Sequence, residues 1–151
     1  MRILLAFILV PFLAVAQPKG AADKLYEDYE GKPYISSFAL GGSWLSKLPI
    51  DIEFDKEVNG VTNVLEGEVK RIQFLRTNDE DRAEECYKAW LKFLKRKGYK
   101  RIVIPQEDGD DMVLYVRGTR KRFDEVHIVS LDGQATFITV YGDFTLKKKS
   151  K

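Results

Sequence analysis

The chain has 151 residues, with 25 basic and 23 acidic side chains and a formal net charge of +2. This length predicts one domain with a single hydrophobic core, and the near balance of charge argues against nucleic acid as a partner. The chain holds one cysteine, Cys86. An intramolecular disulfide is therefore excluded, and packing must stabilise the fold.

Residues 1–16 have the pattern of a cleavable signal peptide. Arg2 precedes an apolar run from Ile3 to Leu13, and the segment ends in the small-x-small pattern Ala14-Val15-Ala16. The run is shorter than the ~20 residues that a membrane-spanning helix needs. We expect cleavage before Gln17, which is not the cysteine that a lipid anchor requires. Since no later apolar run is long enough to span a membrane, we expect no transmembrane segment in the mature chain.

Residues 17–67 carry weak structural signals. The spacing of apolar side chains over residues 23–29 predicts one short helix, which glycine and proline end. Residues 34–40 are apolar and aromatic but irregular. Residues 50–67 alternate weakly around Asn59-Gly60, a turn signal, and form either a long connection or a loose edge hairpin.

A strong strand pattern begins after Glu68. In residues 69–77, Ile72 and Phe74 share one side, and Arg71, Gln73 and Leu75 share the other. We expect the side that carries Ile72 and Phe74 to face the helix that follows.

That helix is the best-defined element of the sequence. Asn78 is expected to cap it, acidic residues occupy its first turn, and Lys95-Arg96-Lys97 occupies its last turn before Gly98. An apolar stripe along one side predicts that the helix packs on a sheet. The stripe comprises Ala83, Cys86, Tyr87, Trp90, Leu91 and Leu94.

Two hairpins follow the long helix. Residues 99–104 and 112–117 flank an acidic turn, and residues 123–131 and 135–141 flank Asp132-Gly133, a strong hairpin signal. The order β-α-β-β-β-β, after a short N-terminal helical region, predicts a two-layer α+β fold. We expect a mainly antiparallel sheet of about five strands with one long helix packed on one face.

No catalytic constellation is evident. His127, the sole histidine, alternates with apolar neighbours in a strand pattern, and Cys86 lies in the apolar stripe of the long helix. The acidic turn at 107–111 lacks the spaced ligands of a calcium-binding loop. We expect no catalytic residue, no cofactor and no metal site, and hence no enzyme. Scattered carboxylates such as Glu66 and Glu68 leave an enzyme as the third hypothesis.

Two groups of residues are candidates for binding. Tyr34, Phe38 and Trp44 lie in the irregular segment, where aromatic side chains either fill the core or anchor a partner. The basic residues are either a solvated surface or a site for anionic lipid or lipopolysaccharide. They are Arg117, Arg120, Lys121 and Arg122, with Lys147, Lys148, Lys149 and Lys151 at the C-terminus.

Five segments carry a family resemblance through their order and spacing. They are Glu30 to Ser36, Lys70 to Thr77, Ala89 to Tyr99, Asp108 to Arg117, and Phe123 to Leu146 with its Gly142-Asp143 pair. The chain resembles the domain-of-unknown-function 4252 family of exported proteins from Bacteroidota and related bacteria. The resemblance implies an envelope protein of a Gram-negative bacterium, in the periplasm or outside the cell. It implies no activity, cofactor or catalytic residue.

These observations lead to one working hypothesis. We expect residues 17–146 to form a single domain of unknown function, followed by a basic tail at 147–151. The leading function is a non-enzymatic envelope domain that binds another protein or an envelope component. The alternative is a basic surface that binds anionic lipid or lipopolysaccharide. The sequence indicates neither the partner nor the oligomeric state.

Overall fold

The structure is a computed structural model that describes the backbone of residues 20–47, 49–58, 61–104 and 112–150. The expected signal peptide, the Asn59-Gly60 turn, the acidic turn at 107–111 and Lys151 lie outside these residues. The elements in chain order are α1 (Ala21–Tyr29), β1 (Ile35–Gly41), the 3-10 turn η1 (Leu45–Lys47), β2 (Pro49–Val58), β3 (Val61–Thr77), α2 (Glu80–Arg96), β4 (Lys100–Ile104), β5 (Met112–Gly118), β6 (Arg122–Asp132) and β7 (Gln134–Ser150).

All strands join one antiparallel sheet in the order β1-β3-β7-β6-β5-β4, and β2 pairs with β3 as well. The mainly antiparallel α+β class is confirmed. The sheet has seven strands rather than about five, because the weakly patterned segment supplies β1 and β2. Residues 50–67 follow the hairpin alternative, with Val58 paired to Val61. The predicted order β-α-β-β-β-β holds from β3 onward.

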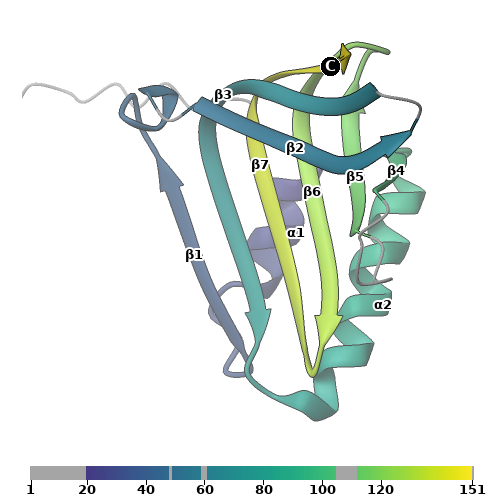
Figure 1. The fold of residues 1–151 in the computed structure, drawn as a ribbon. Helices are drawn as coiled ribbons and strands as arrows, with labels where there is room; N and C mark the ends of the chain where they lie inside the picture. The colour runs from purple at the N-terminus through teal and green to yellow at the C-terminus, as the bar shows by residue number, and fades with distance from the viewer. Residues whose placement is uncertain (1–19, 48, 59–60, 105–111, 151) are drawn as a thin grey trace, which may run out of the picture.

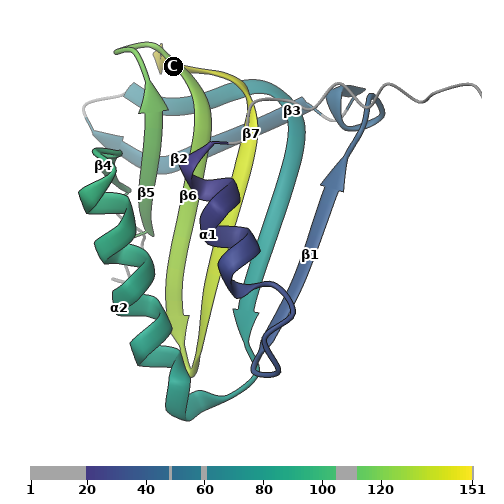
Figure 2. The same ribbon diagram turned by 180° about the vertical axis from the view of Figure 1, so that it is seen from behind.

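The short helix predicted at residues 23–29 is confirmed as α1, and it lies with α2 on the same face of the sheet, where the sequence predicted the long helix alone (Figure 2). The α2 helix starts one residue later than expected, because Asp79 is its N-cap and accepts a hydrogen bond from the backbone of Asp81. Asn78 instead accepts a hydrogen bond from the Ser36 hydroxyl, at 2.7 Å. Gly98 follows the helix with φ +75°, a left-handed conformation that favours glycine.

The main core lies between the helices and the sheet. Trp90 of α2 is fully buried and packs against Tyr29 of α1 and Phe137 of β7, with ring centroids 5.5 and 5.7 Å apart. Leu75 belongs to the same core, whereas Ile72 contributes to a second one. The prediction that the helix covers Ile72 and Phe74 was therefore wrong. The helices cover the side that carries Arg71, Gln73 and Leu75.

The sheet bends where β3 passes from β2 to β1. A bulge lies between Val69 and Arg71, and the arm formed by β2 and the first half of β3 crosses in front of the sheet (Figure 1). At this bend the backbones of β3 and β7 approach closely. A Cβ atom on Gly142 would lie 2.1 Å from the Glu68 carbonyl oxygen, so glycine is required there. A second core gathers near the bend and includes Val69, Phe144 and Phe123.

The β7 strand continues through Ser150. Residues 147–150 therefore pair in register with β3 instead of leaving the domain as a tail. None of the helices in the described residues is both long enough and apolar enough to cross a membrane.

Candidate functional site

The outer edge of the sheet at β1 is the most unusual surface of the molecule. Phe38 and Leu40 of β1 are 46 % and 41 % exposed, and Trp44, just beyond the strand, is 52 % exposed. In the described part of the chain β1 pairs with β3 alone, so the other edge of its backbone carries unpaired amide and carbonyl groups. We refer to this edge, together with the side chains of Phe38, Leu40 and Trp44, as the β1 surface.

The β1 surface lacks the devices that keep sheet edges from pairing. The sequence of β1 is ISSFALG, with no charge and no proline, and its register against β3 runs without a bulge. Natural edge strands are usually blocked by such features. The opposite edge, β4, begins with Lys100 and Arg101. The contrast marks β1 as an edge that another strand can join.

An apolar row continues from β1 across the sheet, on the face away from the helices. Phe38 pairs with Phe74, Phe74 with Ile138, and Ile138 with Ile128. The rings of Phe38 and Phe74 stack with centroids 4.7 Å apart. Phe74, Ile138 and Ile128 are only half-buried. An added strand beside β1 would extend this row by one more side chain.

The covered side of the sheet carries polar side chains as well as the apolar side chains of the main core. Asp23 of α1 is 3 % exposed and accepts hydrogen bonds from Arg71 at 2.6 and 3.0 Å and from Gln73 at 2.8 Å. Burial alone would raise the pKa of the Asp23 carboxyl. The hydrogen bonds from Arg71, Gly20 and Gln73, with the charge of Arg71, hold that pKa below its ordinary value. This ion pair fixes α1 onto the sheet.

A second buried polar group lies beside β6 and β7. Glu125 and His127 are both fully buried; Tyr99 donates a hydrogen bond to Glu125 at 2.8 Å, and Arg117 Nε lies 2.9 Å from the other carboxylate oxygen. His127 Nδ1 lies 3.0 Å from the Thr139 hydroxyl, and its Nε2 lies 3.1 Å from Glu125. The Glu125 carboxylate and the His127 imidazole are closed off from solvent.

Burial determines the protonation states of the interior histidine and cysteine. It lowers the pKa of His127, against the opposing effect of Glu125, so the imidazole is neutral near pH 7. Burial also raises the pKa of the Cys86 thiol, which keeps it protonated. In the described residues no three His, Cys, Asp or Glu side chains are grouped to hold a metal ion. The interior polar residues serve one another as hydrogen-bond partners and counter-charges.

The structure separates the three aromatic candidates. Phe38 and Trp44 are exposed at the β1 surface. Tyr34 is partly buried against the main core, and the Arg82 guanidinium lies 4.7 Å from the centre of its ring. Leu40 was missed by sequence reasoning, although it lies two residues after Phe38 and so on the same side of the strand.

The structure brings the two basic segments together, because Arg122 pairs with Thr145 and the backbone amide of Leu146 donates a hydrogen bond to the Lys121 carbonyl at 3.3 Å. Several of these cations nevertheless have carboxylate partners within the chain. Arg117 pairs with Asp124, Arg122 pairs with Asp143, and Lys147 pairs with Glu66. Arg120 and Lys121 are exposed between β5 and β6. Lys148 and Lys149 continue β7, while Lys151 lies outside the described residues. The paired carboxylates reduce the positive charge that this region offers to an anionic lipid.

Residues 29–151 match the family described as Domain of unknown function (DUF4252), and the chain belongs to that family. No curated protein and no solved structure matches the chain.

Proposed function

We propose that this protein is a non-enzymatic binding domain of the cell envelope, and that an extended segment of a partner protein pairs with β1. Backbone hydrogen bonds to the unpaired edge would supply part of the affinity, and side chains that extend the apolar row would supply specificity. The observation that carries the proposal is the combination of an uncharged edge with Phe38 and Leu40 exposed on it.

Energetics favour the apolar residues over the basic ones as anchors. A few large side chains usually carry most of an interface, and aromatic residues are prominent among them. The cations at Arg117, Arg122 and Lys147 already have carboxylate partners within the chain. Partner binding should therefore survive 1 M salt, at which the Debye length falls to about 3 Å.

A charge placed on the edge tests the proposal. In Phe38→Lys and Leu40→Lys, a lysine on β1 should block strand addition and lower partner recovery from envelope extract at least about 30-fold, as loss of an interface anchor of about 2 kcal/mol does. Protection of the β1 amides from hydrogen exchange in the isolated complex identifies the pairing directly.

The opposite edge provides a matched control. Val103 of β4 is 40 % exposed, close to Leu40, so Val103→Lys introduces the same charge on a strand that already carries basic residues. Val103→Lys should leave recovery unchanged. Equal loss in all three variants, or binding that disappears at high salt, would contradict the proposal. Protection of β1 in a complex of two identical chains would show that the partner is a second copy.

We also propose that the protein reaches the envelope by export, as the pattern of residues 1–16 and the resemblance to exported Bacteroidota proteins suggest. Cleavage before Gln17 would remove the apolar segment and leave α1 intact. The intact mass of the protein recovered from a periplasmic fraction checks this. A chain that retains residues 1–16 would contradict it.

A further inference from the structure

A groove of about 430 Å³ lies between α1 and α2. Both helices lie on the face of the sheet away from the apolar row (Figure 2). The apolar part of the groove includes Leu25 of α1 and Phe93 of α2, which are buried, and the small side chains of Ala21 and Ala89. A volume of this size is within the range of about 300–1,000 Å³ found for small-molecule sites.

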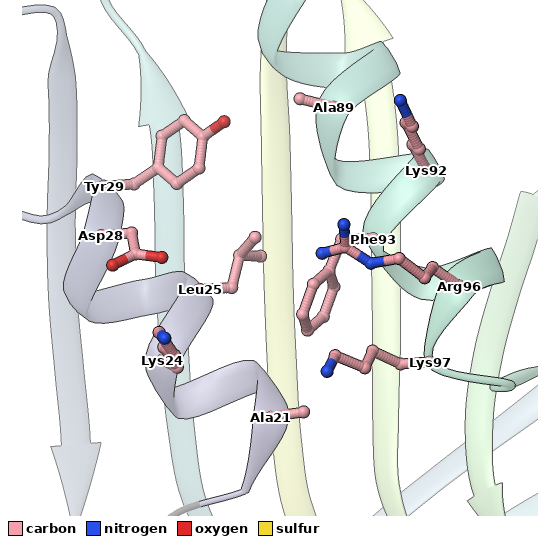
Figure 3. A pocket seen from close by; sticks show the side chains of 10 residues that line it. All are labelled: Ala21, Lys24, Leu25, Asp28, Tyr29, Ala89, Lys92, Phe93, Arg96 and Lys97. Atoms are coloured by element: carbon pink, nitrogen blue, oxygen red, sulfur yellow. The ribbon is translucent and has the colours of Figure 1, made fainter.

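Four cations surround this apolar floor. Lys24 comes from α1, Lys92 and Arg96 come from α2, and Lys97 is the C-cap of α2. The side chains of Arg96 and Lys97 extend toward α1 (Figure 3). Among the described lining residues, Asp28 is the acidic one. None of the four cations forms an ion pair within the described part of the chain. The groove therefore has an excess of positive charge over an apolar surface.

Helix stability does not account for this arrangement. Cations in the last turn of a helix interact favourably with its dipole, which explains Arg96 and Lys97. Lys92 lies four residues before Arg96, where two like charges repel. Lys24 lies in the first turn of α1, where the helix dipole disfavours a cation. The helix dipole thus acts against Lys24 and a like-charged neighbour acts against Lys92, yet both line the same groove.

We propose that this groove binds a single-chain anionic lipid, with its head group held by the cations and its acyl chain against Leu25 and Phe93. The positive charge selects the anionic head group, and the apolar floor selects the acyl chain. Neither part of the lipid alone should therefore bind as tightly as the whole molecule. The site is separate from the β1 surface, and the two can be tested independently.

Titration calorimetry of the mature chain with dodecyl phosphate, below the concentration at which it forms micelles, tests this proposal. One molecule should bind per chain. Inorganic phosphate and dodecyl maltoside, which supply the head-group charge and the alkyl chain separately, should each bind at least about tenfold more weakly, a difference of 1.4 kcal/mol.

Adjacent residues provide the matched variants. Arg96→Glu should weaken dodecyl phosphate binding about tenfold or more through charge reversal within the groove. Lys95→Glu makes the same change one residue earlier in the same helical turn, on an exposed side chain that does not line the groove, and should change binding less than about twofold. Phe38→Lys should leave it unchanged, because β1 lies elsewhere. Thermal melts verify that each variant is folded.

Three results would overturn the proposal. The first is the absence of saturable dodecyl phosphate binding to the folded chain. The second is equal binding of dodecyl maltoside, which would make the charge irrelevant, or of inorganic phosphate, which would make the acyl chain irrelevant. The third is an equal effect of Arg96→Glu and Lys95→Glu on dodecyl phosphate binding. That result would show that binding depends on the net charge of the chain and not on the groove.

Discussion

His127 and Glu125 show how the fold accommodates buried polar side chains. Both lie in a strand that reads as ordinary alternation, yet both are fully buried under the helices. Tyr99 and Arg117 supply a hydrogen bond and a counter-charge to the carboxylate. A buried charge without such partners would be strongly destabilising. Glu125 and His127 are therefore tolerated as members of a connected polar group, in which each side chain depends on its neighbours.

The histidine predicts a specific pH dependence. Burial lowers the pKa of His127 below that of the unfolded chain, about 6.5. As pH falls through that value the unfolded state takes up a proton before the folded state does, so the free energy of unfolding decreases. The slope should approach, and not exceed, about 1.4 kcal/mol per pH unit between pH 6.5 and the lower folded pKa. Urea unfolding at a series of pH values measures it.

The variant His127→Gln separates this effect from the carboxylates. Since the chain has one histidine, no other imidazole titrates in this range. The variant will be less stable overall, but its stability should be nearly independent of pH between 5 and 7. If the parent and the variant lose stability in parallel over that range, His127 is not the group responsible.

The strands show why part of the fold was predictable and part was not. The alternation in residues 69–77 correctly separates the two sides of β3. The more hydrophobic side was predicted to lie under the helix, but the helices cover the other side. The reason is non-local: Asp23, which neutralises Arg71, lies 48 residues earlier in the chain. In β1 six of seven residues are exposed, so no alternation marks the strand. The long helix and the turn of the last hairpin, whose signals are local, were predicted correctly, whereas β7 continues to Ser150 instead of ending at residue 141.

The same difference between local and non-local signals applies to the two candidate binding surfaces. Phe38 and Trp44 could be selected from the sequence as aromatic residues in an irregular segment. The open apolar row could not, because its members come from β1, β3, β7 and β6 and meet only through the sheet register. The groove likewise joins α1 to α2 across some 60 residues of chain, beyond the reach of any local pattern.

The bend between β3 and β7 predicts a sensitive glycine. In Gly142→Ala the new Cβ would lie 2.1 Å from the Glu68 carbonyl oxygen and 2.5 Å from the Phe144 ring, so the two strands must separate. We expect a loss of about 2 kcal/mol or more, as overpacking in a rigid backbone contact causes. In the control Gly41→Ala, the nearest atom is 3.8 Å from the new Cβ, and stability should change by less than about 0.5 kcal/mol. Chemical denaturation of the two variants compares them; similar losses would contradict this account of the bend.

At the scale of the whole molecule, the family match and the folded unit have different limits. The match begins at residue 29, whereas α1 spans Ala21–Tyr29. The helix contributes three buried side chains to the main core and one carboxylate to the sheet. It also forms one wall of the groove. The folded unit therefore includes α1, which lies before the start of the family match.

Two truncated chains test whether the folded unit needs α1 or only the residues of the family match. A chain that begins at Gln17 should unfold cooperatively, because α1 is complete. A chain that begins at Tyr29 lacks the buried side chains of Leu25 and Tyr26, and each large buried side chain contributes about 2–5 kcal/mol. It also leaves the partly buried charge of Arg71 without Asp23. Since domains are stable by only about 5–15 kcal/mol, the shorter chain should lose most of its folded population at 25 °C. Circular dichroism melts of both chains measure this, and a shorter chain that melts cooperatively within a few degrees of the longer one would place α1 outside the stabilising core.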